Sequence, residues 1–298
     1  MTLKQLEYVV MAAQTGNMTK AADKLFLSQP SLTHAINELE TELNIQIFHR
    51  RNKGITLTKE GEEFLGYARQ ILEQTSLLES KYKENSMRTP RFCVSCQHYS
   101  FAVNAFVDVI RQFDSNRYDF ILRETQTNEI IEDVSTLKSE IGILYLSHRN
   151  RDVLTAAFRK NDLIFKELFT AKPHVFISNR HPLADRDEVT LEDLEPYPYL
   201  SYEQGDYNSF YYSEEILSSI ERSKNIMVRD RATLFNLAVG LNGYTVCSGV
   251  INEELNGGNI IAKPLIADEI MHIGILYKKN IPFTRYGDAF LKALDKYV

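Results

Sequence analysis

Residues 27–43 read Leu-Ser-Gln-Pro-Ser-Leu-Thr-His-Ala-Ile-Asn-Glu-Leu-Glu-Thr-Glu-Leu, and this stretch decides the fold of the first part of the chain. Ser28 is a preferred helix N-cap, and Pro30 falls in the first turn, where a missing N–H is tolerated. The apolar positions that follow recur at three- and four-residue steps: Leu32, Ala35 or Ile36, Leu39 and Leu43. The stretch therefore predicts an amphipathic helix with one buried face.

The other face of this helix carries uncharged side chains that donate and accept hydrogen bonds: Gln29, Ser31, Thr33, His34 and Asn37. Two helical segments precede it, the first ending at Gly16-Asn17 and the second capped, we expect, by Thr19. Two helices joined by a tight turn, the second with a polar face, form a helix-turn-helix that reads base edges in the major groove. The pattern also fits the solvated face of an ordinary bundle, and the helix alone does not choose between the two.

A basic hairpin is predicted directly after these helices. Residues 48–58 indicate strand, turn and strand, with the turn at 52–54. Arg50, Arg51 and Lys53 cluster on this hairpin, where cationic side chains can hold phosphates. A basic hairpin beside a polar helix is typical of a winged helix-turn-helix, so it favours DNA binding over the bundle.

The first sixty residues resemble the LysR-type transcriptional regulators. The matching residues keep the order and spacing of that family: Leu6-Glu7-Tyr8-Val9, Gly16-Asn17-Met18-Thr19-Lys20-Ala21-Ala22, Leu27-Ser28-Gln29-Pro30-Ser31-Leu32-Thr33, Ile36-Asn37-Glu38-Leu39-Glu40, Leu43, Ile47-Phe48-His49-Arg50 and Leu57-Thr58-Lys59-Glu60-Gly61. Ala35 departs from the family, which often has Gln there, and this puts one phosphate or base contact in doubt. We expect residues 1–58 to form the DNA-binding domain, with DNA contacts at these residues: Thr19, Ser28, Gln29, Pro30, Ser31, Thr33, His34, Asn37, Arg50, Arg51 and Lys53.

Residues 59–88 are expected to form a linker helix. Thr58 can cap it, and Glu60 and Glu62 lie near its positive N-terminal end. Apolar or small residues follow at alternating steps of four and three: Phe64, Ala68, Ile71, Thr75, Leu78 and Tyr82. This heptad spacing predicts that two chains pair through Phe64, Ala68, Ile71, Leu78 and Tyr82, with a plain amphipathic helix as the alternative. The family resemblance implies the same pairing.

From Arg91 onward strands and helices alternate, which predicts a mostly parallel sheet covered by helices. The resemblance implies a two-lobed effector domain at 91–298, like the type II periplasmic binding proteins. Lobe I would span about 91–165 and 268–298, and lobe II about 166–265, with crossings near 165–169 and 264–268. The fold expected for the whole chain is α/β and multi-domain, with an all-α winged helix-turn-helix head and a linker helix before the two-lobed α/β body.

A cleft between two lobes would be lined by strand ends and helix N-termini, whose free N–H groups bind anions and polar groups. Ten residues are expected to bind an effector there: Gln97, His98, Tyr99, Ser100, Thr125, Thr127, Tyr145, Tyr202, Arg231 and Thr233. We expect a small polar or anionic effector. The alternative is that the Ser and Thr residues only cap helices.

Charge is distributed unevenly along the 298 residues. The total is −6, but residues 1–59 hold seven Lys or Arg and five Asp or Glu, so a head of +2 precedes a remainder of −8. This asymmetry fits contact with phosphates at one end only. No apolar run reaches the about 18 residues that a membrane helix needs, and no signal-peptide core follows Met1. Three cysteines do not make a disulfide framework, so we expect a cytoplasmic protein with no membrane partner.

Other function classes fit less well. Cys93 and Cys96 make a redox-responsive regulator of the same architecture an alternative, although an offset of three on a strand points the two side chains to opposite faces. The sequence lacks a nucleophile elbow, a phosphate-binding glycine loop and a metal-binding motif, so we expect no enzyme activity, metal or cofactor. An enzyme on a two-lobed fold would leave the head unexplained. An architectural DNA-binding protein would leave the body unexplained.

Together these features predict a sequence-specific, DNA-binding transcriptional regulator. A dimer would hold double-stranded promoter DNA through two recognition helices, and the resemblance implies that two dimers join into a homotetramer. Effector binding would change the arrangement of lobes or subunits, and with it DNA bending and the access of RNA polymerase.

Overall fold

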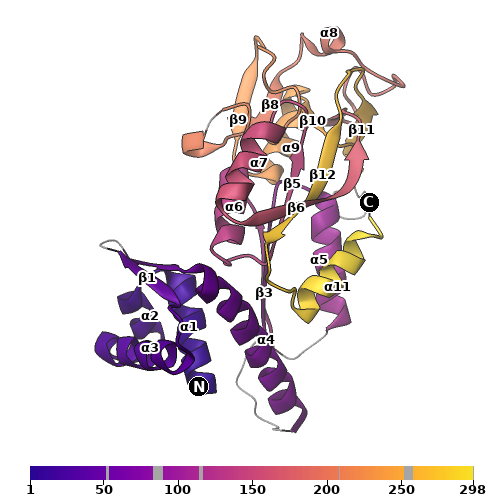
Figure 1. Cartoon of the computed structure of the whole chain (residues 1–298). Coiled ribbons are helices and arrows are strands. Elements are labelled where there is room, and N and C mark those ends of the chain that lie inside the picture. Colours follow the sequence, from indigo (N-terminus) through magenta and orange to yellow (C-terminus); the bar gives the residue numbers. More distant parts are fainter. Residues whose placement is uncertain (52–53, 83–89, 114–116, 208, 252–257, 298) are drawn as a thin grey trace.

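The structure, a computed structural model, describes residues 1–51, 54–82, 90–113, 117–207, 209–251 and 258–297. A small helical head, one long helix and a larger α/β body follow one another along the chain (Figure 1). The long helix lies between head and body and contacts both, so it sets how the two are placed.

The head consists of three helices and a hairpin: α1 (Leu3–Thr15), α2 (Met18–Lys24), α3 (Gln29–Leu43), β1 (Phe48–Arg51) and β2 (Gly54–Leu57). The side chain of Ser28 caps α3, as predicted. Gly16 ends α1 with a φ of 59°, in the left-handed region that glycine adopts without strain. The N-cap of α2 is Asn17, whose Oδ1 accepts two backbone N–H groups of the first turn, so the cap predicted at Thr19 is wrong. Thr19 lies inside the first turn of α2 instead.

The apolar face of α3 forms the centre of the head. Leu32, Ile36 and Leu39 are fully buried and belong to one cluster with Val9 and Ala12 of α1. Each buried side chain of this size contributes about 1.5–3 kcal/mol of hydrophobic stabilisation. The burial of this face leaves the polar face of α3 directed outward.

The long helix α4 (Lys59–Tyr82) leaves the head at a close crossing. Thr58 Oγ1 accepts the N–H of Gly61 at 2.8 Å, which confirms Thr58 as its capping residue. A Cβ at Gly61 would lie 2.1 Å from the carbonyl oxygen of Ile47. The absence of a side chain at Gly61 therefore lets α4 pass directly over the segment that enters β1.

The first sheet of the body has five strands in the order β4-β3-β5-β12-β6. The strands are β3 (Arg91–Cys96), β4 (Asp119–Glu124), β5 (Ile141–Leu146), β6 (Leu163–Ala171) and β12 (Met271–Lys278). Strand β3 pairs in parallel with β4 and β5, as predicted, whereas β12 runs antiparallel to β5 and β6. Helices α6 (Thr127–Ser135) and α7 (Arg151–Lys160) pack on one face, and α5 (Ser100–Gln112) and α11 (Arg285–Leu294) on the other.

The second sheet has the order β10-β7-β11, with the parallel pair β8-β9 beside it. Its elements are β7 (His174–Ser178), α8 (Leu191–Leu194), β8 (Tyr199–Tyr202), the 3₁₀ turn η1 (Gly205–Tyr207), β9 (Asn225–Val228), α9 (Arg231–Leu241), β10 (Thr245–Cys247) and β11 (Ile260–Pro264). The chain leaves the first sheet after Ala171, beyond the crossing expected at 165–169, because β6 pairs with β12 up to that residue. Helix α7 and strands β6 and β11 were not predicted from the sequence.

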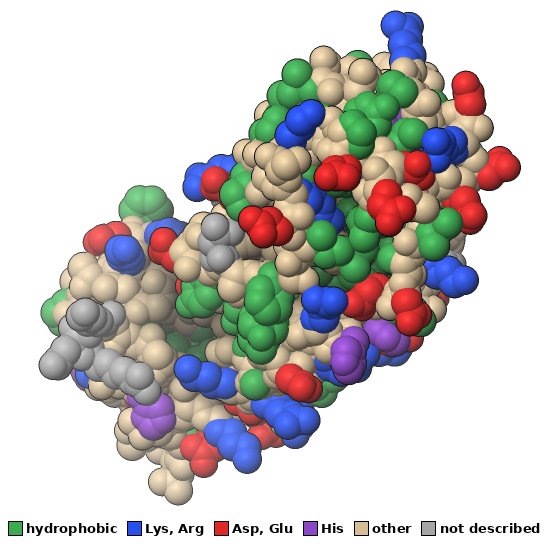
Figure 2. All heavy atoms as spheres, turned by 90° about the horizontal axis from the view of Figure 1, so that it is seen from above, with side chains coloured by type: hydrophobic (Ala, Val, Ile, Leu, Met, Phe, Trp, Pro, Cys, Tyr) green, Lys and Arg blue, Asp and Glu red, His purple; other side chains and the backbone are tan. Residues whose placement is uncertain are grey.

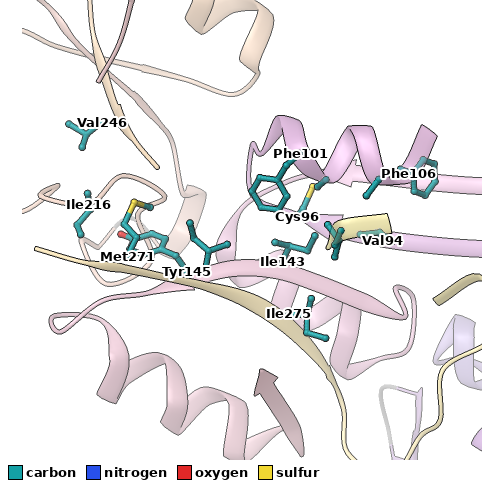
Figure 3. Close-up of a cluster of buried hydrophobic side chains, with 14 of the residues drawn as sticks. Val94, Cys96, Phe101, Phe106, Ile143, Tyr145, Ile216, Val246, Met271 and Ile275 are labelled. Carbon is teal, nitrogen blue, oxygen red and sulfur yellow. The ribbon is translucent and has the colours of Figure 1, made fainter. Parts of the chain in front are cut away.

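One hydrophobic cluster joins the two sheets. Val94 and Ile143 lie on the first sheet and Val246 on the second, and all three belong to the same cluster. Figure 3 shows Tyr145 and Met271 lying between these two groups. The lobes therefore share apolar contact at the base of the cleft.

Candidate DNA-binding surface and effector cleft

Helix α3 presents the predicted polar row on the outside of the head. Gln29, Ser31, His34 and Asn37 are exposed, and Thr33 is half-buried. Gln29 Nε2 donates a hydrogen bond to Thr33 Oγ1 at 2.9 Å. The row thus offers donors and acceptors along successive turns of an exposed helix, which is what direct readout of base edges requires.

The other predicted contacts of this region lie at helix starts. Thr19 is exposed in the first turn of α2, and Ser28 and Pro30 are exposed at the start of α3. Ser28 Oγ lies 2.7 Å from Ser31 Oγ, so the two hydroxyls form one exposed pair. Helix N-termini attract phosphate, so these residues stand where a DNA backbone could approach.

The hairpin packs beside α3, and hydrogen bonds join it to α3 and to the turn after α1. The Arg50 guanidinium donates to Asn37 Oδ1, which joins β1 to the polar face of α3. The N–H of Ile55 donates to the carbonyl of Gly16 at 2.9 Å, which joins β2 to the turn after α1. Two predicted contacts fall outside the described residues: the side chain of Arg51 and the whole of Lys53.

The body differs from the head in charge. The head carries +2 over residues 1–59, and the remainder carries −8. Figure 2 shows acidic side chains spread over the body, interspersed with basic and apolar ones. A nucleic acid would therefore meet its most favourable potential at the head.

A histidine–carboxylate pair joins the two lobes at the start of α5. His98 directs both its backbone N–H and its ring Nδ1 at Glu214 Oε2, over 3.1 Å and 2.8 Å. Its ring stacks on Tyr202, with ring centroids 3.7 Å apart. Both members of the pair are buried, each with 5% of its side chain exposed. Glu214 follows η1 in the second lobe, so a carboxylate of the protein itself fills this end of the cleft.

Gln97 is the centre of a buried hydrogen-bond network. Its Nε2 donates to Thr127 Oγ1 at 2.7 Å, and its Oε1 accepts from the Tyr99 hydroxyl and from the N–H of Tyr145. The N–H of Thr127 donates to Gln204 Oε1 across the lobes at 3.0 Å. Four predicted effector residues are thus brought together, but largely to bond one another.

A cavity of about 40 Å³ lies beside the histidine–carboxylate pair. Four of the ten predicted effector residues line it: His98, Tyr99, Tyr202 and Arg231. The other six are placed elsewhere: Gln97, Thr127 and Tyr145 in the buried network, Ser100 bonded to the Val250 carbonyl, Thr125 bonded to Glu129, and the exposed Thr233 bonded to Asp230. For Thr125 and Thr233, the observed bonds are those of the local helix starts.

The acidic wall of this cavity was not predicted from the sequence. Glu215 is 2% exposed; its Oε1 accepts the N–H of Tyr202 at 2.8 Å, while its Oε2 has no hydrogen-bond partner. Burial, together with the adjacent charge of Glu214, raises the pKa of Glu215 to about 8. The missed residues also include Phe176, Phe235 and Thr245. The available signal was two consecutive acidic residues one position beyond an aromatic stretch that ends at Tyr212.

Two family models match the chain: the bacterial regulatory helix-turn-helix protein of the LysR family over residues 3–62, and the LysR substrate binding domain over residues 91–297. The chain belongs to the LysR family. The protein is therefore a DNA-binding transcriptional regulator with an effector-binding domain, and the family is not one of enzymes.

Relatives and solved structures agree with membership of the LysR family. The Hca operon transcriptional activator HcaR of Escherichia coli is 26% identical over 93% of this chain and 90% of its own length. YvbU, an HTH-type transcriptional regulator of Bacillus subtilis, is 27% identical over 69% of this chain and 67% of its own. A variant of full-length OxyR from Pseudomonas aeruginosa has a TM-score of 0.57 at 20% identity, covering 99% of this chain and 94% of that one. This likeness concerns the fold.

The linker helix of this LysR-family chain has only part of its predicted seam open. Ile71 and Leu78 are 40% and 61% exposed, and Tyr67, which was not predicted, is 58% exposed on the same side. Ala68 is buried within the chain and Phe64 packs against the head, so neither is free for a second chain. The side chain of Tyr82 lies outside the described residues. Of the predicted pairing residues, Ile71 and Leu78 are therefore the ones exposed on the described part of α4, and Tyr67 adjoins them.

The same helix is attached to the body. Glu62 pairs with Lys278 at 2.8 Å, and the half-buried Arg69 donates to the carbonyl of Leu137 at 2.7 Å. A Cβ at Gly66 would contact Ile281 at 3.6 Å. These contacts bring the end of the first sheet against the linker helix.

The positions of the two cysteines of β3 argue against a disulfide or another redox reaction between them. Cys93 lies 3.0 Å from Ser139 Oγ on one side of the strand, and Cys96 belongs to the apolar cluster on the other. Burial raises the pKa of both thiols, that of Cys96 to about 12. Both therefore stay as unreactive thiols near neutral pH. Within the described residues, no group of three or more His, Cys, Asp or Glu could hold a metal, and no helix has the length and apolar character to cross a membrane.

Proposed function

We propose that the protein reads specific promoter sequences as a dimer and that a small polar molecule in the inter-lobe cleft modulates this binding. The observation that carries the proposal is the exposed polar row of α3 with Arg50 of the hairpin joined to it. Polar side chains would read base edges, and the hairpin would hold phosphate. Thr33, His34 and Asn37 are the residues we assign to sequence readout.

A path from the cleft to the head supports the modulation. His98 and Glu214 join the lobes at the cleft, and lobe I is attached to α4 through Lys278 and the carbonyl of Leu137. The path ends at Gly61, where α4 passes directly against the head. A ligand that separates the lobes would therefore change the position of α4 relative to the body, and with it the spacing of two heads.

Dimerisation through α4 supports specificity. The exposed residues Tyr67, Ile71 and Leu78 form an apolar strip on one side of the helix. Burying that strip against a second copy would set two recognition helices at a fixed spacing. Assembly of two dimers, and with it a longer or bent DNA site, belongs to the same proposal.

DNA selection from a random pool, followed by footprinting with the full chain, tests this function. The expected result is one enriched motif with two half-sites and a discrete footprint. Arg50→Ala should weaken binding to all sequences and lower the salt slope by roughly one, as for the loss of one phosphate contact. Asn37→Ala should change the preferred sequence more than the slope.

A matched control is Arg159→Ala, which removes an exposed arginine from α7 of the body. It should leave motif, footprint and salt slope unchanged. Uniform coverage of DNA with no enriched motif would instead show an architectural protein. Equal effects of Arg50→Ala and Arg159→Ala would show that the head does not contact the DNA.

A further inference from the structure

Two helices of lobe I, α5 and α6, begin at the cleft without a cap from their own side chains. Their N-cap residues are Tyr99 and Gln126, and neither side chain forms a capping hydrogen bond. Thr127, the first residue of α6, is fully buried, so water does not reach its N–H. The first N–H groups of a helix have no partner within the helix. The acceptors for these helix starts therefore have to come from another part of the chain.

Lobe II supplies two acceptors from one short segment. Gln204 Oε1 accepts the N–H of Thr127 at 3.0 Å, and Glu214 Oε2 accepts the N–H of His98, just before α5, at 3.1 Å. The two acceptors are also joined to each other, because Gln204 Nε2 donates to Glu214 Oε1 at 3.4 Å. Both residues are buried. Two linked side chains of lobe II thus occupy the N–H groups to which an effector with acceptor atoms would bind.

The segment that carries Gln204 and Glu214 also packs against lobe I. We call residues 204–207 and 209–214 the strap. Gly205 has a φ of 54°, in the left-handed region that favours glycine, and a Cβ there would lie 2.9 Å from Gln126 Oε1. Near the other end of the strap, Tyr212 packs against the apolar cluster between the first sheet and helices α6 and α7. The strap therefore contacts lobe I through its backbone and an aromatic ring as well as through the two acceptors.

We propose that the strap is a built-in ligand: Glu214 and Gln204 hold the cleft closed, and an effector enters only by displacing them. This inference rests on the proposed function, because it concerns how the same cleft opens. The ion pair of Arg231 with Glu124 also joins the lobes, so release of the strap loosens the cleft and does not separate the lobes. The apparent affinity of an effector is then lowered in proportion to the fraction of chains whose strap is open.

Chemical rescue of Glu214→Ala in the full chain tests whether the carboxylate acts as a ligand. The substitution removes a CH₂–COO⁻ group, which acetate matches in size and charge. In thermal unfolding at neutral pH, acetate should raise the Tm of this variant by a few degrees at saturation, and the neutral acetamide should raise it less. Glu195→Ala removes the same group from the exposed end of α8 and is the matched control. This control and the unaltered chain should respond to acetate no more than to sodium chloride of equal ionic strength.

Gln204→Ala is a second variant that tests the strap if Glu214→Ala does not fold. It removes the acceptor of the Thr127 N–H, so hydrogen exchange at the start of α6 should become roughly tenfold faster or more, while exchange in α11 stays unchanged. Unchanged exchange at α6, or a folded Glu214→Ala that responds to acetate only as the unaltered chain does, would overturn the assignment. Footprinting separates the two proposals: a rescued Glu214→Ala whose footprint is the same with and without acetate supports the strap and contradicts a role of the cleft in regulation.

Discussion

Replacing Glu215 by Gln should remove a large part of the pH dependence of stability. The carboxyl is buried beside Glu214, with Arg222 as the nearby opposing charge, and its pKa is raised from 4.5 to about 8. Between these two values the unfolded chain has lost the proton while the folded chain retains it. Stability therefore falls as pH rises, by about 1.4 kcal/mol per pH unit. Between about pH 5.5 and pH 8 this amounts to about 3 kcal/mol.

In Glu215→Gln the amide oxygen can still accept the N–H of Tyr202, and no proton has to leave. From about pH 5.5 to pH 8 the stability of the variant relative to the unaltered chain should rise by about 3 kcal/mol, which corresponds to several degrees in Tm. Thermal unfolding of both proteins across this range measures the difference, in which the titration of other groups cancels. Glu195→Gln, whose side chain is exposed, should follow the unaltered chain. Parallel pH curves for Glu215→Gln and the unaltered chain would refute the reasoning.

Three further substitutions test the attachments of α4. Gly61→Ala places a methyl group against the carbonyl of Ile47 and should cost about 1–3 kcal/mol in thermal or urea unfolding, whereas Gly240→Ala, with nothing within 4 Å, should be neutral or slightly stabilising. Ile71→Glu puts a charge on the exposed strip and should shift the protein from dimer to monomer in light scattering, without loss of helix in circular dichroism. Arg69→Met leaves a buried carbonyl unpaired and should cost about 1–3 kcal/mol, seen as faster proteolysis near α4; unchanged proteolysis would show that this contact does not hold the linker.

The head could be predicted closely because its information is local. Ser28 caps α3 within one turn, and Gly16 supplies the left-handed residue at which α1 must end. The error at Thr19 has the same local origin, since Asn17 and Thr19 are both N-cap residues two positions apart. Only the backbone shows which of them is extended, and it is Asn17.

The cleft could be predicted only in part because its walls come from distant segments. His98 and Tyr202 stand beside strands that the alternating pattern already located. Glu214 and Glu215 lie in an irregular stretch whose path depends on packing against both lobes, and no periodicity marks it. Edge strand β6 was missed for a related reason, because its register against its one neighbour, β12, shifts near Leu168, and the consecutive exposed residues Lys166 and Glu167 break the alternation typical of a strand.

The residues by which α4 contacts the head are next in the sequence to those by which it contacts the body. Gly61 and Leu65 face the head, whereas Glu62, Gly66 and Arg69 face the body. Successive residues of a helix are about 100° apart around its axis. Head and body therefore contact the same turns of α4 from two directions that differ by about this angle. Adding or removing one residue within these turns would swing the recognition helix around the body by about that angle. The helical phase of this short stretch therefore determines which way the DNA runs past the effector domain.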